Sequence, residues 1–314
     1  MKIRYILMTA LSAMALNACS ERVTEDKSNE VKETYFAEEV LDQVEEEDRL
    51  QNVRIPPIPD SLTFAGERVP LEYPDVRESL MLELSLLTYG HGGMIRTMNL
   101  VSRYEDMVKK ILREEGVPED LFYLAVAESG LRPVTSPAKA AGYWQFIKPT
   151  AKRYGLKIEK DVDERYDWDK ATRAAATYLK ECYDEFGTWA LAAASYNIGE
   201  KNIRERIEYQ SLNNYYDMQF PEETGRYVFR IMAYKIILEN PEVYGFHLDR
   251  SMLCAPEQWK EVMVTGPVEN WSVFAAEHGT TFKFLKRYNQ WMRLNGMKNR
   301  EKDTFMVRVP LGRN

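Results

Sequence analysis

The sequence has few of the residues that most often bind metal ions. Its 314 residues include three cysteines and three histidines, and none of these stand at the paired spacing of a metal site. We therefore expect no metal and no cofactor. Cys182 and Cys254 could pair in an oxidising compartment, but Cys182 lies on an apolar helix stripe, which favours a buried free thiol.

The chain also lacks a strong charge of either sign over most of its length. The formal net charge is −7, yet residues 20–50 alone hold twelve acidic and four basic side chains. The chain beyond residue 50 is therefore close to neutral. Because nucleic-acid-binding domains usually carry a basic surface, we expect no nucleic-acid partner.

The apolar run near the N-terminus is too short to span a membrane. It covers residues 5–16 after a short positive region, and Leu-Asn-Ala-Cys follows at residues 16–19. This order is typical of a secretory signal peptide, and its end resembles a bacterial lipobox. The resemblance implies a lipoprotein signal peptide over residues 1–18 and membrane attachment through a lipidated Cys19. An ordinary signal peptide with a chance cysteine is the alternative.

Residues 19–60 form an acidic segment with no sustained apolar period, closed by the proline-rich stretch 56–59. This composition predicts a flexible tether between the anchor and a folded domain. Ser20, directly after Cys19, is not the aspartate associated with inner-membrane retention in some bacteria. We therefore expect an outer-membrane lipoprotein that faces the periplasm of a Gram-negative bacterium.

No alternating strand pattern interrupts residues 77–245, which we predict to form one α-helical domain. A glycine-rich break at residues 90–93 separates one helical pattern from the next, which is expected to begin near residue 94 or 99. Apolar residues then recur at helical spacing. The clearest helices are expected over residues 169–186, 189–196 and 223–239.

A helix that ends near Gly130 carries the first candidate catalytic residue. Leu121, Leu124, Ala125 and Glu128 occupy one face of this helix. Because Glu128 continues an apolar stripe, burial would raise its pKa and keep a proton available near neutral pH. Such a carboxyl suits acid-catalysed glycosidic cleavage. The alternative is that Glu128 lies at the edge of the stripe and points to water.

The C-terminal segment has a different pattern. Residues 261–264 and 304–309 are typical of strands, and residues 271–277 and 281–288 are typical of two short helices. We therefore predict a small α+β module with βααβ order over residues 260–311.

Four motifs follow one another through the predicted helical domain. They are Glu-Ser-Gly at 128–130, Gly-Tyr-Trp-Gln-Phe at 142–146, Ser-Tyr-Asn-Ile-Gly at 195–199 and Glu-Thr-Gly-Arg-Tyr-Val at 223–228. Their order resembles the lytic transglycosylases of the Slt family, most closely the membrane-bound type D branch, over about residues 95–240. Tyr143 and Ser195 depart from the residues that this family usually has, but neither is a proposed proton-transfer group.

The resemblance implies a mainly α, goose-lysozyme-like fold with a cleft for peptidoglycan glycan strands. It assigns Glu128 as the single catalytic acid and base, with Tyr227 beside it to position the carboxyl. The implied reaction is non-hydrolytic and leaves 1,6-anhydro-N-acetylmuramic acid ends. The other residues that the resemblance places around the cleft as substrate-binding residues are Ser129, Gln145, Tyr196 and Asn197.

The C-terminal segment resembles a single divergent LysM module. The matching pattern lies at residues 271–275, 285–289 and 305–310. This resemblance implies binding of glycans that contain N-acetylglucosamine. A structural cap packed against the catalytic domain is the alternative.

Two further functions stay open at this point. A muramidase that uses water would need a second carboxylate, for which Asp163, Glu164, Asp167 and Asp169 are candidates, although acids in loops and at helix starts are usually solvated or capping residues. A non-catalytic peptidoglycan-binding lipoprotein is the other possibility. The presence of Glu128 together with the other cleft residues argues against it.

Overall fold

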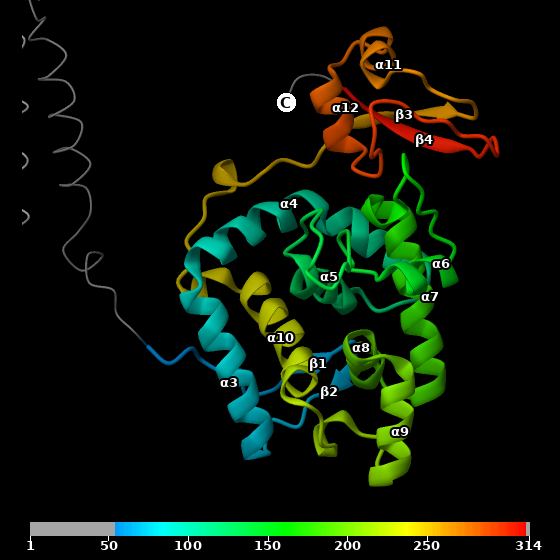
Figure 1. The fold of residues 1–314 in the computed structure, drawn as a ribbon. Coiled ribbons are helices and arrows are strands. Elements are labelled where there is room, and N and C mark those ends of the chain that lie inside the picture. The colour runs from blue at the N-terminus through cyan, green and yellow to red at the C-terminus, as the bar shows by residue number, and fades with distance from the viewer. Residues whose placement is uncertain (1–53, 312–314) are drawn as a thin grey trace, which may run out of the picture. The chain divides into compact units, whose positions relative to one another are not determined.

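The computed structural model describes residues 54–311 of the chain (Figure 1). The chain divides into two units, residues 1–54 and 55–314, and all described helices and strands belong to the second. The predicted signal peptide, Cys19 and most of the predicted tether lie outside the described residues.

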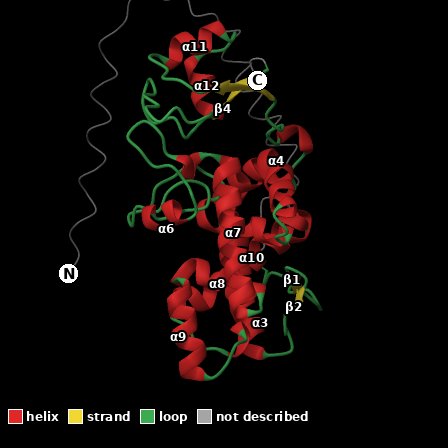
Figure 2. Cartoon of the chain, turned by 90° about the vertical axis from the view of Figure 1, so that its right-hand side faces the viewer, coloured by secondary structure: helices red, strands yellow, loops and turns green. Residues whose placement is uncertain are grey.

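A mostly helical domain comes first and a small βααβ module follows, so the predicted fold class is confirmed (Figure 2). The helical domain contains a short hairpin, a series of α-helices and several single turns of 3-10 helix. Its elements are β1 (Thr63–Phe64), β2 (Glu67–Arg68), α3 (Pro74–Tyr89), α4 (His91–Glu114), η1 (Glu119–Leu121), α5 (Phe122–Ser129), α6 (Lys148–Arg153), η2 (Glu164–Tyr166), α7 (Trp168–Phe186), α8 (Trp189–Ile198), α9 (Glu200–Gln210), η3 (Tyr215–Asp217), α10 (Glu222–Glu239), η4 (Pro241–Tyr244) and η5 (Arg250–Met252). Those of the module are β3 (Trp259–Val264), α11 (Trp271–Glu277), α12 (Phe282–Tyr288) and β4 (Phe305–Pro310).

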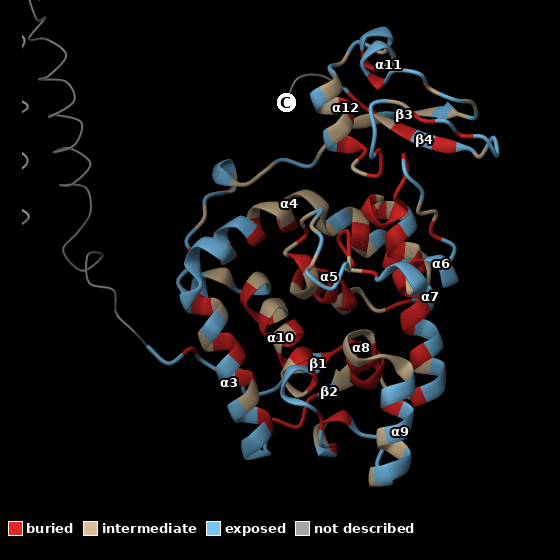
Figure 3. Ribbon diagram, in the orientation of Figure 1, coloured by how far each residue is buried: buried red, intermediate tan, exposed pale blue. Residues whose placement is uncertain are grey.

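The short helix α5 lies in the middle of the core. Its residues 122–126 are all buried, and it packs against α4 on one side and α10 on another (Figure 3). Gly130 ends it in the left-handed conformation, with φ of 56°, and donates its N–H to the Val126 carbonyl. The last turn of α5 therefore stands at a fixed place between two longer helices.

Side-chain caps set the ends of the helices that frame α5. Asp167 begins α7 by accepting hydrogen bonds from the backbone N–H groups of Asp169 and Lys170, at 3.0 and 3.1 Å. Gly187 ends α7 in the left-handed conformation, and Thr188 then caps the start of α8. These signals are local, and the predicted helices over 169–186 and 189–196 agree with α7 and α8 to within two residues.

The structure differs from the sequence prediction at the start of α4. This helix begins at His91, whereas a start near residue 94 or 99 was expected. Gly90 alone makes the break: its N–H bonds to the Leu87 carbonyl of α3, and its own carbonyl accepts from Met94 of α4. Helix α9 and the β1–β2 hairpin were also not anticipated. Phe64 of the hairpin is fully buried in the main core.

The C-terminal module has its own core around an antiparallel pair of strands. β3 and β4 pair from Trp259 opposite Pro310 to Val264 opposite Phe305. Trp271 of α11 and Leu285 of α12 are fully buried against this pair. The module therefore has the predicted strand, helix, helix, strand order.

This module packs on the loop that precedes α7. Val162 forms a β-bridge with Met292, the Asp163 N–H donates to the Trp291 carbonyl at 3.0 Å, and the Arg293 N–H donates to the Asp161 carbonyl at 2.9 Å. Ala141, Val162 and Tyr166 of the helical domain share the core of the module. The module is thus joined to the segment that carries Asp163, the first of the four acidic loop candidates.

Several classes of site are absent from the part of the chain that the structure describes. Within residues 54–311 no helix is both long and apolar enough to cross a bilayer, and no three His, Cys, Asp or Glu side chains gather where they could hold a metal ion. Cys182 and Cys254 are both free, and Cys182 is buried, as the free-thiol interpretation predicted.

Candidate active site

Glu128 stands on the last turn of α5 with its carboxyl group half-buried. The Tyr227 hydroxyl of α10 donates a hydrogen bond to Glu128 Oε1. Burial raises the pKa of the Glu128 carboxyl to about 7, because the ionised form loses its water. The Tyr227 hydrogen bond and the Arg230 charge act in the opposite direction. Glu128 therefore still carries a proton in a substantial fraction of molecules near pH 7, and it lies on the last turn of the helix.

One face of α10 supplies the groups around Glu128. Glu223, Tyr227 and Arg230 are spaced four and three residues apart, and all three affect the pKa of Glu128. Arg230 Nη1 pairs with Glu223 Oε1 at 2.9 Å, and Arg230 Nε lies 3.3 Å from Glu83 Oε2. The Arg230 charge beside Glu128 is therefore balanced by Glu223 of α10 and by Glu83 of α3.

Glu83 of α3 fixes α10 in this position. Its side chain is 2% exposed and accepts hydrogen bonds from Arg226 at 2.6 Å and Arg230 at 3.3 Å. Sequence reasoning assigned no role to Glu83 or to either arginine. The spacing of Arg230 from Tyr227 could have indicated that the two share a face of α10. The partner of Arg230, Glu83 of α3, is 147 residues away in sequence, so no local pattern could have indicated that pair.

Three of the predicted substrate-binding residues meet on the loop at residues 142–146. The Ser129 hydroxyl donates to the Tyr143 carbonyl at 2.7 Å, and the Tyr196 hydroxyl donates to the Trp144 carbonyl at 2.8 Å. Gln145 Nε2 donates to the Gly142 carbonyl at 2.6 Å and to the Val134 carbonyl at 3.1 Å. These side chains therefore hold the loop beside α5 through its backbone.

Arg165 holds the same loop from the other side. Its guanidinium donates to the carbonyls of Lys139 and Phe146 at 3.1 and 3.0 Å, and it pairs with Asp163 at 2.7 Å. Gly142 has φ of 81°, and a Cβ atom there would lie 1.7 Å from the Arg165 carbonyl oxygen. Only glycine allows this close approach.

Asn197 lies on α8 and is joined to α10 rather than to the loop. Its Oδ1 accepts a hydrogen bond from the Thr224 hydroxyl at 2.8 Å. The structure thus brings Tyr227 into direct contact with Glu128 and gathers Ser129, Gln145 and Tyr196 around one loop. Asn197 belongs to neither group, because its side chain bonds to Thr224 of α10.

The four acidic residues considered as a second carboxylate all have structural partners. Asp163 pairs with Arg165, and Asp167 caps α7. Glu164 accepts a hydrogen bond from the Lys157 N–H at 2.7 Å and pairs with Lys170, and Asp169 pairs with Arg173 at 3.0 Å. The acidic residue that does affect the pKa of Glu128 is Glu223, which raises it and is paired with Arg230.

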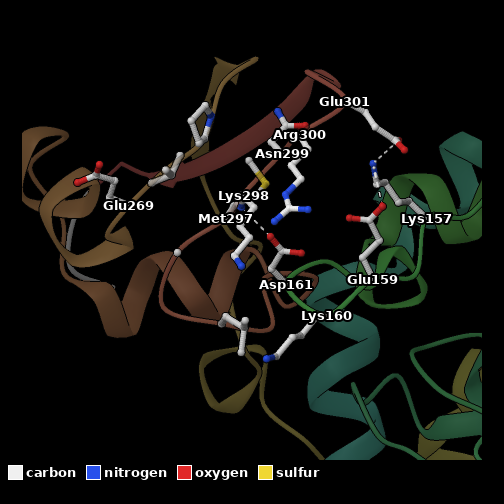
Figure 4. Close-up of a pocket in the computed structure, with 14 residues that line it drawn as sticks. Lys157, Glu159, Lys160, Asp161, Glu269, Met297, Lys298, Asn299, Arg300 and Glu301 are labelled. Atoms are coloured by element: carbon white, nitrogen blue, oxygen red, sulfur yellow. Dashed lines mark hydrogen bonds and ion pairs between the residues drawn. The ribbon is translucent and has the colours of Figure 1, made fainter.

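A cavity of about 830 Å³ lies on the C-terminal module, away from Glu128 (Figure 4). The loop at residues 157–161 forms one wall, and residues 294–301 form much of another. Its charged side chains are of both signs: Lys157 bonds to Glu301 at 2.9 Å, and Asp161 accepts from the Lys298 N–H at 2.7 Å. This cavity is therefore separate from the Glu128 site.

Comparison with known proteins identifies families for two segments of the chain. Residues 106–219 match the transglycosylase SLT domain family, and residues 260–313 match the soluble lytic transglycosylase C-terminal LysM-like domain family. The first segment is therefore similar to the transglycosylase SLT domains, and the predicted resemblance to the Slt family is confirmed.

Within that class, the chain is similar to membrane-bound lytic murein transglycosylase D from two strains of Escherichia coli. The identity is 31% over 247 residues, which covers 75% of this chain and 52% of each relative. The chain thus spans about half the length of the curated relatives that it matches. Among solved structures, an inactive mutant of the lytic transglycosylase Slt from Pseudomonas aeruginosa overlaps 48% of this chain and 26% of its own, with 19% identity and a TM-score of 0.34.

Tyr227→Phe tests whether the hydroxyl tunes and positions the acid. This hydrogen bond favours the ionised carboxylate, so its loss should raise the pKa of Glu128 further and move the alkaline limb of the kcat/KM profile to higher pH. Because hydrogen bonds to charged groups contribute about 1.5–3 kcal/mol, turnover should fall by at least about tenfold.

Tyr234→Phe is the matched control, since Tyr234 lies on the same helix and its hydroxyl does not contact Glu128. It should leave the pH profile of kcat/KM unchanged. If Tyr227→Phe also keeps wild-type turnover and pH dependence, Tyr227 is only a core residue.

Proposed function

We propose that this chain is a peptidoglycan lytic transglycosylase that uses Glu128 as its single acid and base. The observation that carries the proposal is the half-buried Glu128 carboxyl, whose pKa is raised to about 7 and which contacts the Tyr227 hydroxyl. The domain families and the curated relatives support the same substrate class. The bond cleaved is the one between N-acetylmuramic acid and N-acetylglucosamine.

The proposed reaction has two proton transfers through one carboxyl group. Glu128 first protonates the glycosidic oxygen, and the bond from that oxygen to C1 of N-acetylmuramic acid breaks. The C6 hydroxyl of the same sugar then attacks C1, and the ionised Glu128 takes its proton. The products are a new hydroxyl on one fragment and a 1,6-anhydro end on the other. Glu128 is again protonated, and no water is consumed.

The water-using muramidase is less well supported by the contacts. It would need a carboxylate free to activate water on the opposite face of the sugar. Asp163, Glu164, Asp167 and Asp169 are all engaged with structural partners, and Glu223 is paired with Arg230 at 2.9 Å. A purely glycan-binding function would not need the proton held on Glu128.

Glu128→Gln tests the proposal, because glutamine keeps the shape of the side chain but can neither give nor take the proton. We expect a folded protein that still binds sacculi and cleaves them at least about 100-fold more slowly. Mass spectrometry of wild-type digests should show 1,6-anhydro ends. Near wild-type cleavage by the variant would remove Glu128 from catalysis, and muramic ends that borohydride reduces would identify a muramidase.

We also propose that the chain is an outer-membrane lipoprotein facing the periplasm, attached through Cys19. The apolar run followed by cysteine supports the anchor, and the relative from Escherichia coli is named as membrane-bound. Glycan binding by the module at residues 260–311 stays a prediction. The packing of this module against the loop at 161–163 also supports a structural role for the module.

Cys19→Ala should move the processed protein from the membrane fraction to the soluble periplasmic fraction, because the acyl chains would be missing. Cell fractionation followed by immunoblotting measures this. The released protein should cleave sacculi as fast as the wild-type protein released by detergent. Continued membrane association after signal cleavage would contradict the anchor.

A further inference from the structure

Two arginines of α10 bind one buried carboxylate from a different helix. Arg226 Nε donates to Glu83 Oε1 at 2.6 Å, and Arg230 Nε donates to Glu83 Oε2 at 3.3 Å. The arginines are four residues apart, so they share the face of α10 that meets α3 (Figure 1). The Glu83 side chain is 2% exposed. Its two oxygens therefore face guanidinium groups rather than water.

The other carboxylates of this ion-pair network are open to solvent. Glu223 pairs with Arg230 at 2.9 Å, and its side chain is 61% exposed. Glu222 lies 3.6 Å from Arg226, and its side chain is 86% exposed. Exposed ion pairs contribute little to the placement of a side chain, because water and salt screen them. Glu83 is therefore the partner that fixes the position of the Arg230 guanidinium.

The position of Arg230 matters because its positive charge acts on Glu128. Arg230 follows Tyr227 by three residues on α10, and the Tyr227 hydroxyl donates to Glu128 Oε1. Burial raises the pKa of Glu128, whereas the Tyr227 hydrogen bond and the Arg230 charge lower it. A guanidinium released from its own partners could pair with the Glu128 carboxylate. Such a pair would favour the ionised form, which has no proton to donate.

No other group near Glu128 can replace Glu83 in this respect. Within residues 54–311, the side chains that affect the pKa of Glu128 or respond to its charge are Tyr196 of α8 and Glu223, Tyr227 and Arg230 of α10. Arg230 also affects the pKa of Tyr215 and Tyr234, but burial raises both of these pKa values and keeps the two phenols neutral near pH 7. Among these described groups, Glu83 is the only buried carboxylate that binds Arg230.

We propose that Glu83 is a positioning residue for the reaction at Glu128. From α3 it keeps the Arg230 guanidinium paired, so that the Tyr227 hydroxyl and not a guanidinium binds the Glu128 carboxyl. The proposal rests on the proposed function, since it gives Glu83 the task of keeping Glu128 able to donate a proton. Glu83 acts through Arg230.

A purely structural role for Glu83 predicts a different outcome. The two ion pairs would then only hold α10 against α3, and their loss would lower the rate by the same factor at every pH. The positioning role predicts a loss that depends on pH, because it changes the fraction of molecules in which Glu128 carries a proton.

Glu83→Gln is the test variant, because glutamine has nearly the same shape but lacks the negative charge that holds Arg230. We expect the pKa of Glu128 to fall by about 0.7 and the alkaline limb of the kcat/KM profile to move to lower pH by the same amount. For full-length protein in detergent acting on sacculi, kcat/KM should fall about threefold at pH 7 but less than about 1.5-fold at pH 5.5.

Asp120→Asn is the matched control. Asp120 of η1 pairs with Lys235 at 2.9 Å, so it also joins α10 to another element. Lys235 is not among the groups that affect the pKa of Glu128. Thermal denaturation should show that Asp120→Asn lowers stability, whereas the alkaline limb of its kcat/KM profile should stay at the wild-type pH.

Two further variants keep the test valid if Glu83→Gln does not fold. The double variant Glu83→Gln, Arg226→Gln removes one charge of each sign, which a protein tolerates better than the loss of one partner of a buried pair. Arg230 still loses Glu83 in this variant, so the alkaline limb should again move to lower pH. Glu83→Asp keeps the negative charge and should hold the limb at the wild-type pH.

Carbon-13 NMR of the Glu128 carboxyl separates this proposal from the proposed function, because it needs no turnover. The pKa of Glu128 should fall in Glu83→Gln, and adding Arg230→Gln should remove that fall. A wild-type protein that cleaves nothing would count against the enzyme alone, and a lowered pKa in Glu83→Gln would still support the positioning role. An unchanged pKa of Glu128 in Glu83→Gln and in its double variant with Arg226→Gln, or an equal loss of rate at every pH, would overturn that role.

Discussion

The removal of one carboxyl group from water is the constraint on which the rest of the structure depends. Burial raises the pKa of Glu128 to about 7, so the folded protein holds a proton that the unfolded chain releases from pH 4.5 upward. Stability therefore falls as pH rises through that interval, by about 3 kcal/mol in total. The remaining contacts of the domain must offset this cost. In return, the site has an acid that still carries its proton near neutral pH.

Two structural devices keep that carboxyl in place. Glu83 joins α3 to α10 through Arg226 and Arg230, and α10 presents Tyr227 to Glu128. Breaking such a buried ion pair leaves an uncompensated charge, so its partners are expected to be sensitive positions. On the other side, the Arg165 guanidinium fixes the loop at residues 142–146 by donating to the Lys139 and Phe146 carbonyls, and the Arg165 backbone carbonyl leaves room only for glycine at position 142. The C-terminal module packs on the loop that precedes Arg165, through Val162 and Asp163.

Local signals made much of the fold predictable, whereas distant contacts did not. Apolar periodicity predicted α7 closely, and Gly130 marked the end of α5, because these signals lie within the helix or directly after it. The short β1–β2 hairpin and the early start of α4 have no comparable signal. The motif order indicated which residues gather at the site. It could not show that Glu164 and Asp169 are taken up by structural ion pairs, or that Glu83 supports α10 from 143 residues away.

The central claim is that the fold, before any substrate arrives, holds Glu128 protonated near neutral pH. Carbon-13 NMR of glutamate-labelled protein measures it directly, with Glu128→Gln identifying the resonance. The account predicts that the pKa of this carboxyl is about 7, well above the ordinary glutamate value of 4.5. A titration midpoint close to 4.5 would contradict it.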